Sequence, residues 1–144
     1  MNIIIGSDHA GYDLKEECKS FLQKIGGHNV MDIGTFNKES MDYPKIAHQV
    51  ASAVERGEYE RGILVCGTGI GMSMTANRHA GVRAALCLDL YSARMCRLHN
   101  DANVLALGGR ILGVGLALEI LDTFLKTPFE GGRHKPRIDQ IEVK

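Results

Sequence analysis

The chain has 144 residues, of which 17 are Lys or Arg and 17 are Asp or Glu, so its formal net charge at pH 7 is zero. A balanced chain has no overall positive field to attract nucleic acid or an anionic membrane, and any anion site must be local. The longest apolar run is far shorter than the ~20 residues that a membrane span needs. We therefore expect no nucleic acid and no membrane among its partners. The length fits one domain, residues 1–144, large enough to bury about 70% of the surface of the unfolded chain.

The four cysteines, Cys18, Cys66, Cys87 and Cys96, form no C-x-x-C pair and have no histidine at ligand spacing. Nothing at the amino terminus resembles a signal peptide, so we expect a reducing, cytoplasmic compartment. Three of the cysteines, all but Cys66, lie in apolar strand or helix patterns, where free cysteine packs into the core. No pair of histidines or carboxylates has the spacing of zinc or iron sites, so no metal site is expected.

The first half of the chain alternates apolar runs with amphipathic stretches. It predicts a strand over 2–6, a helix that follows Gly11 and ends at Gly26-Gly27, and a strand over 29–34. After a polar loop, Asp42-Tyr43-Pro44 begins a second helix, whose apolar residues recur every four positions and which Gly57 closes.

The second half continues the same alternation. It predicts a strand over 63–65, a short helix through about Asn77, a strand over 82–88, a helix over 90–98, a strand over 103–107 and a helix over about 114–126. The last helix has apolar residues on more than one face. So wide an apolar surface indicates a second partner, for which another copy of the chain is the best candidate.

Strands that alternate with helices through short loops predict an α/β fold. We expect a three-layer αβα sandwich built on a five-stranded parallel, Rossmann-like sheet, with a helix and tail at the carboxyl terminus. In such sheets, ligands bind at the carboxyl ends of the strands. The residues that this edge would collect are Asp8, His9, Cys66, Thr68, Asp89 and Arg110.

The stretch 62–73 runs from an apolar strand into a glycine-rich turn that should open a helix, with Cys66 at the hinge. Gly67, Gly69 and Gly71 let the backbone approach a ligand closely and aim N–H groups at an anion. A thiol placed there feels the positive end of the helix dipole, which favours the thiolate. A tight turn with an inert, buried cysteine would explain a lone Cys-Gly pair. The repeated glycines and the hydroxyl of Thr68 favour a base or nucleophile.

A second cluster, residues 130–137, places two arginines, a histidine and a lysine directly after Gly131-Gly132. Such a cluster can bind a phosphate dianion through several charge-assisted hydrogen bonds. A solvated basic tail is the alternative.

A dinucleotide site fits the glycines poorly. The G-x-G-x-x-G pattern needs glycine where Met72 stands, and in the stretch from Gly6 it needs glycine where Asp8 stands. Nucleotide binding is therefore the weaker interpretation.

Five motifs occur together and in order: GSDHAG at 6–11, DYP at 42–44, CGTGIG at 66–71, HNDANVL at 99–105 and EGGRH at 130–134. With these motifs the chain resembles, over nearly its whole length, the type B ribose-5-phosphate isomerases. Their superfamily also includes galactose-6-phosphate and allose-6-phosphate isomerases, which remain alternatives. A non-catalytic subunit that binds a sugar phosphate or a nucleotide is a further alternative.

The resemblance implies an aldose–ketose isomerisation of a sugar phosphate, through an enediolate and with no metal or cofactor. Cys66 would be the base that moves a proton between C2 and C1 of ribose 5-phosphate to give ribulose 5-phosphate. Thr68 would pass a proton between O1 and O2, and His99 would open the furanose ring. Backbone amides of the turn, at Gly67, Gly69, Ile70 and Gly71, would stabilise the enediolate oxygen.

The resemblance also implies the substrate contacts. Asp8 and Asn100 would hold sugar hydroxyls, and Arg110 would make a further contact. Tyr43 matches a position that lines the site, although a packing role at the start of its helix is equally open. The phosphate would be bound by His9, Arg133 and Arg137. Members are homodimers or dimers of dimers, in which His99, Asn100 and Arg110 enter the site from the neighbouring subunit.

Overall fold

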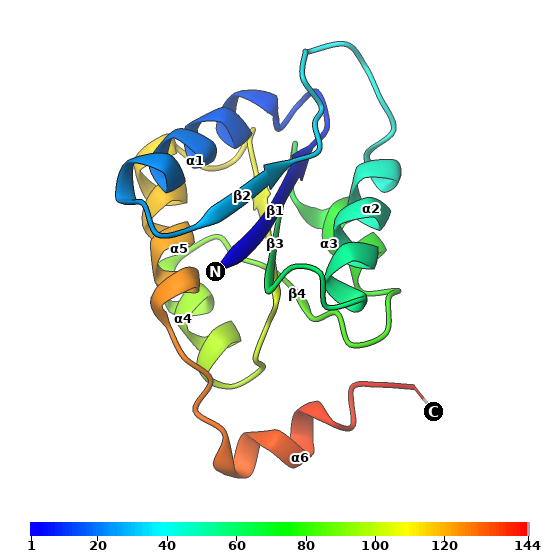
Figure 1. The fold of residues 1–144 in the computed structure, drawn as a ribbon, viewed down its shortest axis with the longest axis vertical. Helices are drawn as coiled ribbons and strands as arrows, with labels where there is room; N and C mark the ends of the chain where they lie inside the picture. The colour runs from blue at the N-terminus through cyan, green and yellow to red at the C-terminus, as the bar shows by residue number, and fades with distance from the viewer. Residues whose placement is uncertain (144) are drawn as a thin grey trace.

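The computed structural model describes residues 1–143 as a five-stranded, all-parallel sheet between two layers of helices (Figure 1). The strand order is β2-β1-β3-β5-β4. In chain order the elements are β1 (Asn2–Ser7), α1 (Tyr12–Ile25), β2 (Asn29–Asp32), α2 (Tyr43–Glu55), β3 (Arg61–Cys66), α3 (Ile70–Ala76), β4 (Ala84–Leu86), α4 (Leu90–Leu98), β5 (Val104–Gly108), α5 (Val114–Lys126), the 3₁₀ turn η1 (Gly132–His134) and α6 (Lys135–Ile138).

The core lies on both faces of the sheet. Ile3 and Ile5 of β1 pack with α1, α4 and α5, whereas Ile4 packs with α2 and α3. Figure 1 shows these two groups of helices on opposite sides of the strands. A strand that is covered on both faces needs apolar residues at every position, which is why the central strands read as continuous apolar runs. The predicted fold class, sheet and helix order are confirmed.

The fourth strand is shorter than the predicted 82–88. Before it, the Val82 N–H donates to the His79 carbonyl in a turn, so Val82 is unavailable to the sheet. Beyond Leu86, the N–H of Cys87 still bonds Ala106, and the chain then turns into α4 at Asp89. The sheet partner of β4 is β5 alone, so β4 is an edge strand.

The topology separates two of the predicted site segments. We call the side of the sheet where the strands end the carboxyl edge, and the side where they begin the amino edge. In a parallel sheet each connecting helix runs from the carboxyl edge back to the amino edge. Therefore α4 begins beside the end of β4 and ends, before His99, at the amino edge. In the pairing of β3 with β5, Gly62 lies opposite Val104 at that edge, and Cys66 lies opposite Gly108 at the other. Cys66 and His99 thus lie at opposite edges of the sheet within one chain. Figure 1 places α6 beyond the amino edge as well.

A buried ion pair fixes the end of β2. The Lys15 side chain is 0% exposed, and its Nζ donates to both carboxylate oxygens of Asp32 at 2.8 Å. Burial alone would raise the pKa of Asp32, but the hydrogen bonds from Lys15 and Lys19 outweigh it and hold that pKa below its usual range. The Gly34 N–H also donates to Asp32, at 2.9 Å. The pair therefore anchors the loop that leads to α2.

The apolar residues of α5 lie on two sides of the helix. Ile120, Leu121 and Phe124 are buried in the core, whereas Val114 and Leu116 are exposed. Within residues 1–143, no helix is both long enough and apolar enough to span a bilayer.

Candidate active site

The glycine-rich turn after β3 wraps around the sulfur of Cys66. Cys66 is the last residue of β3 and is 5% exposed. The Gly69 N–H donates to its Sγ at 3.1 Å, and Gly69 has a φ of 80°, a left-handed conformation that favours glycine. The next N–H, of Ile70, donates to the Thr68 hydroxyl at 3.2 Å. The turn therefore places a thiol, a hydroxyl and backbone N–H groups together.

Close packing against β5 holds this turn in place. A Cβ on Gly108 would lie 2.8 Å from the carbonyl oxygen of Thr68, so the two backbones touch directly. The Arg110 N–H donates to the Gly67 carbonyl at 3.0 Å, and the Arg110 side chain lies against Gly67. These contacts lie within one chain, and the implied entry of Arg110 into the site of a neighbouring subunit stays a prediction. Because β5 lies next to β3, its end carries Arg110 to the Cys66 turn of the same chain.

Asp8 and His9 lie next to the Cys66 turn, at the end of β1. Asp8 is buried, and one of its oxygens accepts the N–H of Gly11 at 3.0 Å, at the start of α1. His9 Nδ1 accepts the N–H of Met41 at 3.2 Å. An accepting Nδ1 means that a neutral His9 carries its proton on Nε2. The ring therefore has an N–H donor available for an anion.

Tyr43 begins α2 and lies over the start of α3. A Cβ on Gly71 would fall 2.5 Å from the Tyr43 Cζ atom, so the ring rests directly on Gly71. Tyr43 therefore packs against the glycine turn. We use the term carboxyl-edge group for Asp8, His9, Tyr43, Arg110 and residues 66–71.

The other predicted site residues gather at the amino edge, and we call His99, Asn100, Arg133 and Arg137 the amino-edge group. The Glu130 N–H donates to the Leu98 carbonyl at 3.0 Å, which brings the chain after α5 beside the end of α4. Arg133 and Arg137 are exposed. The structure therefore divides the predicted site into two groups that do not meet within one chain.

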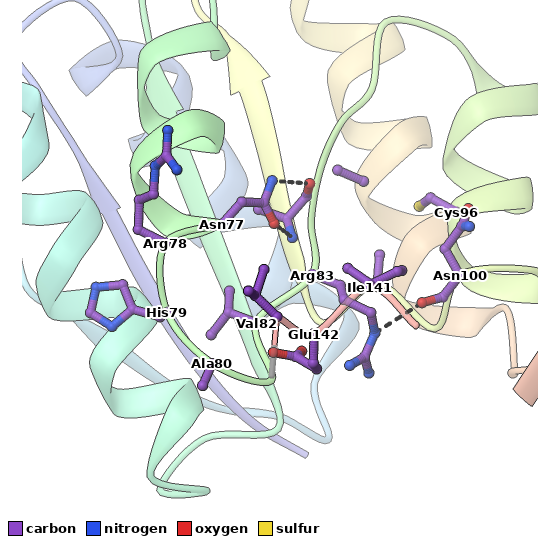
Figure 2. Close-up of a pocket in the computed structure, with 14 residues that line it drawn as sticks. Asn77, Arg78, His79, Ala80, Val82, Arg83, Cys96, Asn100, Ile141 and Glu142 are labelled. Atoms are coloured by element: carbon purple, nitrogen blue, oxygen red, sulfur yellow. Dashed lines mark hydrogen bonds between the residues drawn. The ribbon is translucent and has the colours of Figure 1, made fainter. Parts of the chain in front are cut away.

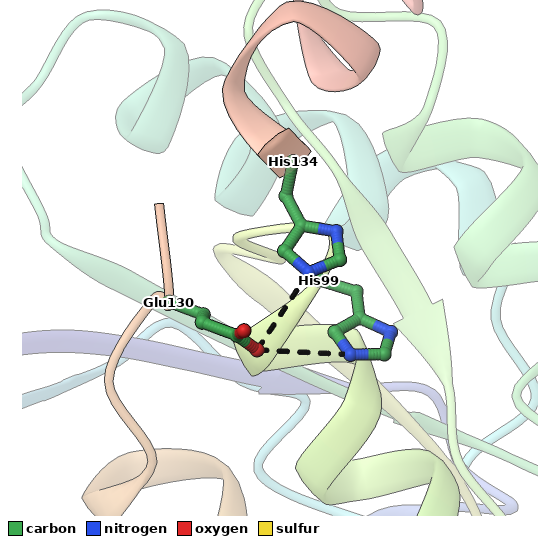
Figure 3. A group of neighbouring side chains, drawn as sticks. All are labelled: His99, Glu130 and His134. Atoms are coloured by element: carbon green, nitrogen blue, oxygen red, sulfur yellow. Dashed lines mark ion pairs between the residues drawn. The ribbon is translucent and has the colours of Figure 1, made fainter. Parts of the chain in front are cut away.

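His134 and Glu130 lie with the amino-edge group; the sequence pattern placed His134 in a candidate phosphate-binding cluster but predicted no pairing with His99. The His134 ring stacks on His99, with centroids 4.3 Å apart and ring planes 16° apart. Figure 3 shows Glu130 reaching both rings, its Oε2 3.6 Å from His134 Nε2 and 3.9 Å from His99 Nε2. Burial, followed by the charge of His99, lowers the pKa of His134. The sequence feature that could have indicated this arrangement is Gly131-Gly132. Their positive φ angles of 71° and 53° turn the chain back and bring His134 onto His99.

A pocket of about 460 Å³ also lies towards the amino edge (Figure 2). It opens between the loop after α3, the end of α4 and the tail segment 141–143. Asn100 contributes to its lining, and the Arg83 Nε donates to the Asn100 carbonyl at 3.0 Å. None of the carboxyl-edge group lines it.

Comparison with known proteins identifies one family. Residues 3–141 match the family model described as Ribose/Galactose Isomerase. The ribose-5-phosphate isomerase B of Escherichia coli is 49% identical over 139 residues, which are 96% of this chain and 93% of the relative.

Solved structures agree along nearly the whole chain. The ribose-5-phosphate isomerase B of Clostridium thermocellum superposes with a TM-score of 0.95 at 55% identity, covering 98% of this chain and 95% of that one. That of Mycoplasma genitalium, solved with bound ribulose-5-phosphate, superposes with a TM-score of 0.93 at 43% identity, covering 97% and 93%.

Proposed function

The chain belongs to the ribose/galactose isomerase family, and we propose that it interconverts D-ribose 5-phosphate and D-ribulose 5-phosphate, a step of the non-oxidative pentose phosphate pathway. The named activity of its relatives and the ribulose 5-phosphate bound to one of them support this substrate. The observation that carries the proposal is the Cys66 sulfur, which the Gly69 N–H holds at the carboxyl edge of the sheet.

Cys66 acts as the base in this proposal. Its thiolate takes the proton from C2 of the open-chain aldose, the C2–H electrons form the enediolate double bond, and the same proton returns to C1 to give the ketose. The Thr68 hydroxyl passes a proton between O1 and O2. Backbone N–H groups of residues 67–71 stabilise the developing oxyanion, and one such donor contributes about 10²- to 10³-fold in rate. The scheme uses no metal and no cofactor.

The carboxyl-edge group holds the sugar. Asp8 uses one oxygen to accept the Gly11 N–H, which leaves the other oxygen for a sugar hydroxyl. His9 presents its Nε2–H to the phosphate, because the Met41 N–H occupies its Nδ1. Arg110 and Tyr43 border the turn on two sides.

We further propose that a second copy of the chain completes the site, in a homodimer or a dimer of dimers. The amino-edge group of one subunit would approach the carboxyl-edge group of the other: His99 to open the furanose ring, Asn100 for a hydroxyl, and Arg133 and Arg137 for the phosphate. The separation of the two groups within one chain supports this arrangement. Exposed apolar side chains on α3, α4 and the loops after β4 and β5 offer surface for such a contact: Ile70, Met74, Leu88, Tyr91 and Ile111.

Two further parts of the proposal concern the chain as a whole. We take residues 1–144 as one sugar-phosphate isomerase domain. We also take the compartment to be reducing, such as the cytoplasm, because all four cysteines are free thiols.

A substrate panel tests the proposal. Purified protein is assayed with ribose 5-phosphate, allose 6-phosphate and galactose 6-phosphate, and kcat/KM is compared. We expect the highest value for ribose 5-phosphate, since a six-carbon sugar needs a longer pocket. A higher value for either hexose phosphate would favour that alternative. No ribulose 5-phosphate formation, with substrate still bound, would favour a non-catalytic binding subunit.

A further inference from the structure

Three potential metal ligands converge at the amino edge of the sheet. His99, Glu130 and His134 each offer one ligand atom, and these atoms lie within 4.8 Å of one another. The two histidines present Nε2 to the same carboxylate oxygen, at 3.9 Å and 3.6 Å (Figure 3). Tetrahedral coordination at 2.0–2.1 Å from a zinc ion would place ligand atoms about 3.3 Å apart. The two spacings to Glu130 exceed this value by about 0.3 Å and about 0.6 Å, and the ligand atoms of the two histidines, which lie within 4.8 Å of each other, must also approach.

Two backbone hydrogen bonds hold the chain segments that carry the three ligands. The Glu130 N–H is bonded to the Leu98 carbonyl, next to His99. The His134 N–H is bonded to the Gly131 carbonyl, and the His134 side chain is almost fully buried. Glu130 is half exposed, which leaves the cluster open to solvent on one side. Two imidazoles and one carboxylate with an open fourth position are a ligand set that zinc ions adopt in proteins.

Two neighbouring guanidinium charges, those of Arg133 and Arg137, oppose a cation beside His134. The Arg133 Nε donates to His134 Nε2, but over a long distance of 3.5 Å. Since Arg133 is exposed, its guanidinium can move into solvent and release that nitrogen. The two ring planes are only 16° apart, so their in-plane Nε2 lone pairs run nearly parallel, and the more exposed His99 ring must rotate for both nitrogens to face one ion.

We propose that His99, Glu130 and His134 bind a divalent transition-metal ion of the zinc class, which inhibits the enzyme by occupying His99. The inhibition rests on the proposed function, in which His99 needs a free ring nitrogen for the proton transfer that opens the furanose. Metal binding itself does not rest on it.

The binding test uses the full chain with Cys66→Ser, so that the thiol of the carboxyl edge cannot bind the ion. After removal of metal with a chelator, Zn²⁺ binding is measured by calorimetry and Co²⁺ binding by visible absorption. We expect one ion per chain, with a Co²⁺ spectrum free of thiolate charge-transfer bands. In Glu130→Gln and in His134→Gln, affinity should fall at least about tenfold, the smallest loss seen when even a supporting residue of a metal site is removed.

His79→Gln is the matched control, because it disrupts the other pair of neighbouring histidines, in which His48 Nδ1 and His79 Nε2 lie 2.8 Å apart. It should leave the affinity unchanged. Equal affinity in Glu130→Gln, His134→Gln and the parent would overturn the metal site. The metal site would also be overturned if His79→Gln were the one substitution that reduced the affinity.

The inhibition test uses chains with Cys66 intact and expresses each rate relative to the same variant without metal. Zn²⁺ should inhibit the parent at concentrations that occupy the site, and His134→Gln should need at least about tenfold more. Binding without inhibition would overturn the regulatory half of the proposal. If the metal-free protein has no isomerase activity, the proposed function is contradicted. The Co²⁺ spectrum would still show whether His99, Glu130 and His134 bind a metal ion.

Discussion

The Gly69 N–H donates a hydrogen bond to the Cys66 sulfur over 3.1 Å. This contact joins the end of β3 to the start of α3 and fixes the thiol at the carboxyl edge. The base in the proposed reaction is therefore positioned by backbone atoms, which side-chain substitutions leave in place.

Replacing Cys66 should abolish most of the activity. We expect kcat to fall by about 10²- to 10⁴-fold in both Cys66→Ser and Cys66→Ala, the range for loss of a general base. Serine keeps an acceptor for the Gly69 N–H, whereas alanine leaves that buried N–H unpaired and should cost about 1–3 kcal/mol more in unfolding free energy. Steady-state rates and denaturant unfolding measure the two effects. A Cys66→Ala enzyme with normal turnover would show that another residue is the base.

Gly11→Ala should strongly destabilise the fold. A Cβ there would lie 2.1 Å from the Val65 carbonyl oxygen, and a backbone atom cannot move aside cheaply. We expect a loss of at least about 1–3 kcal/mol in denaturant unfolding. The control is Gly115→Ala, in α5, where an added Cβ meets nothing within 4 Å. That change should stabilise by about 0.5–1 kcal/mol, through helix propensity. Similar effects at both positions would contradict the packing described.

Asp32→Asn should destabilise the protein by about 3–5 kcal/mol, because it leaves the buried Lys15 ammonium without its main partner. The effect depends on pH. Since the folded-state pKa of Asp32 is lowered, the ion pair contributes fully above the unfolded carboxyl pKa of about 4 and is lost as pH falls through the folded value. The stability gap between parent and variant should therefore narrow below about pH 4, as measured by chemical unfolding at several pH values. A gap that stays constant to acid pH would exclude the ion pair as its cause.

Alkylation should identify Cys66 as the thiol at the substrate site. Iodoacetamide should inactivate the enzyme, and saturating ribose 5-phosphate should slow that inactivation. Burial raises the pKa of Cys18 to about 12, and the hydrogen bond to Cys96, together with burial, raises that of Cys87, so both should react slowly. Peptide mapping by mass spectrometry locates the label. Equal labelling of Cys66 with and without substrate would place it outside the site.

The sequence predicted the parts of the fold that rest on local pattern. The apolar runs of β1, β3 and β5 and the glycines after β3 led to a parallel sheet with Cys66 at its carboxyl edge, and both are observed. Long-range geometry was harder to predict. The contact of Arg110 with the Cys66 turn depends on the adjacency of β3 and β5, strands that are distant in sequence.

The burial of His134 was also beyond the sequence, since residues 130–137 contain no large apolar side chain that would indicate packing against the fold. Only the fold reveals that the positive φ angles of Gly131 and Gly132 turn His134 onto His99. The bounds of β4 depended in the same way on the turn from His79 to Val82: Gly81, with a φ of 72°, marks the turn, but the sequence does not show that the turn extends through Val82.

The most direct test of the shared site mixes two inactive variants. Cys66→Ala and His99→Ala subunits are co-expressed, and the protein carrying both affinity tags is isolated and assayed beside each variant alone. If one subunit supplies Cys66 and the other His99, each mixed dimer has one site free of both substitutions and should regain about half of the parent activity per dimer. If both residues act within one chain, every site stays defective and the mixture remains as inactive as its parts.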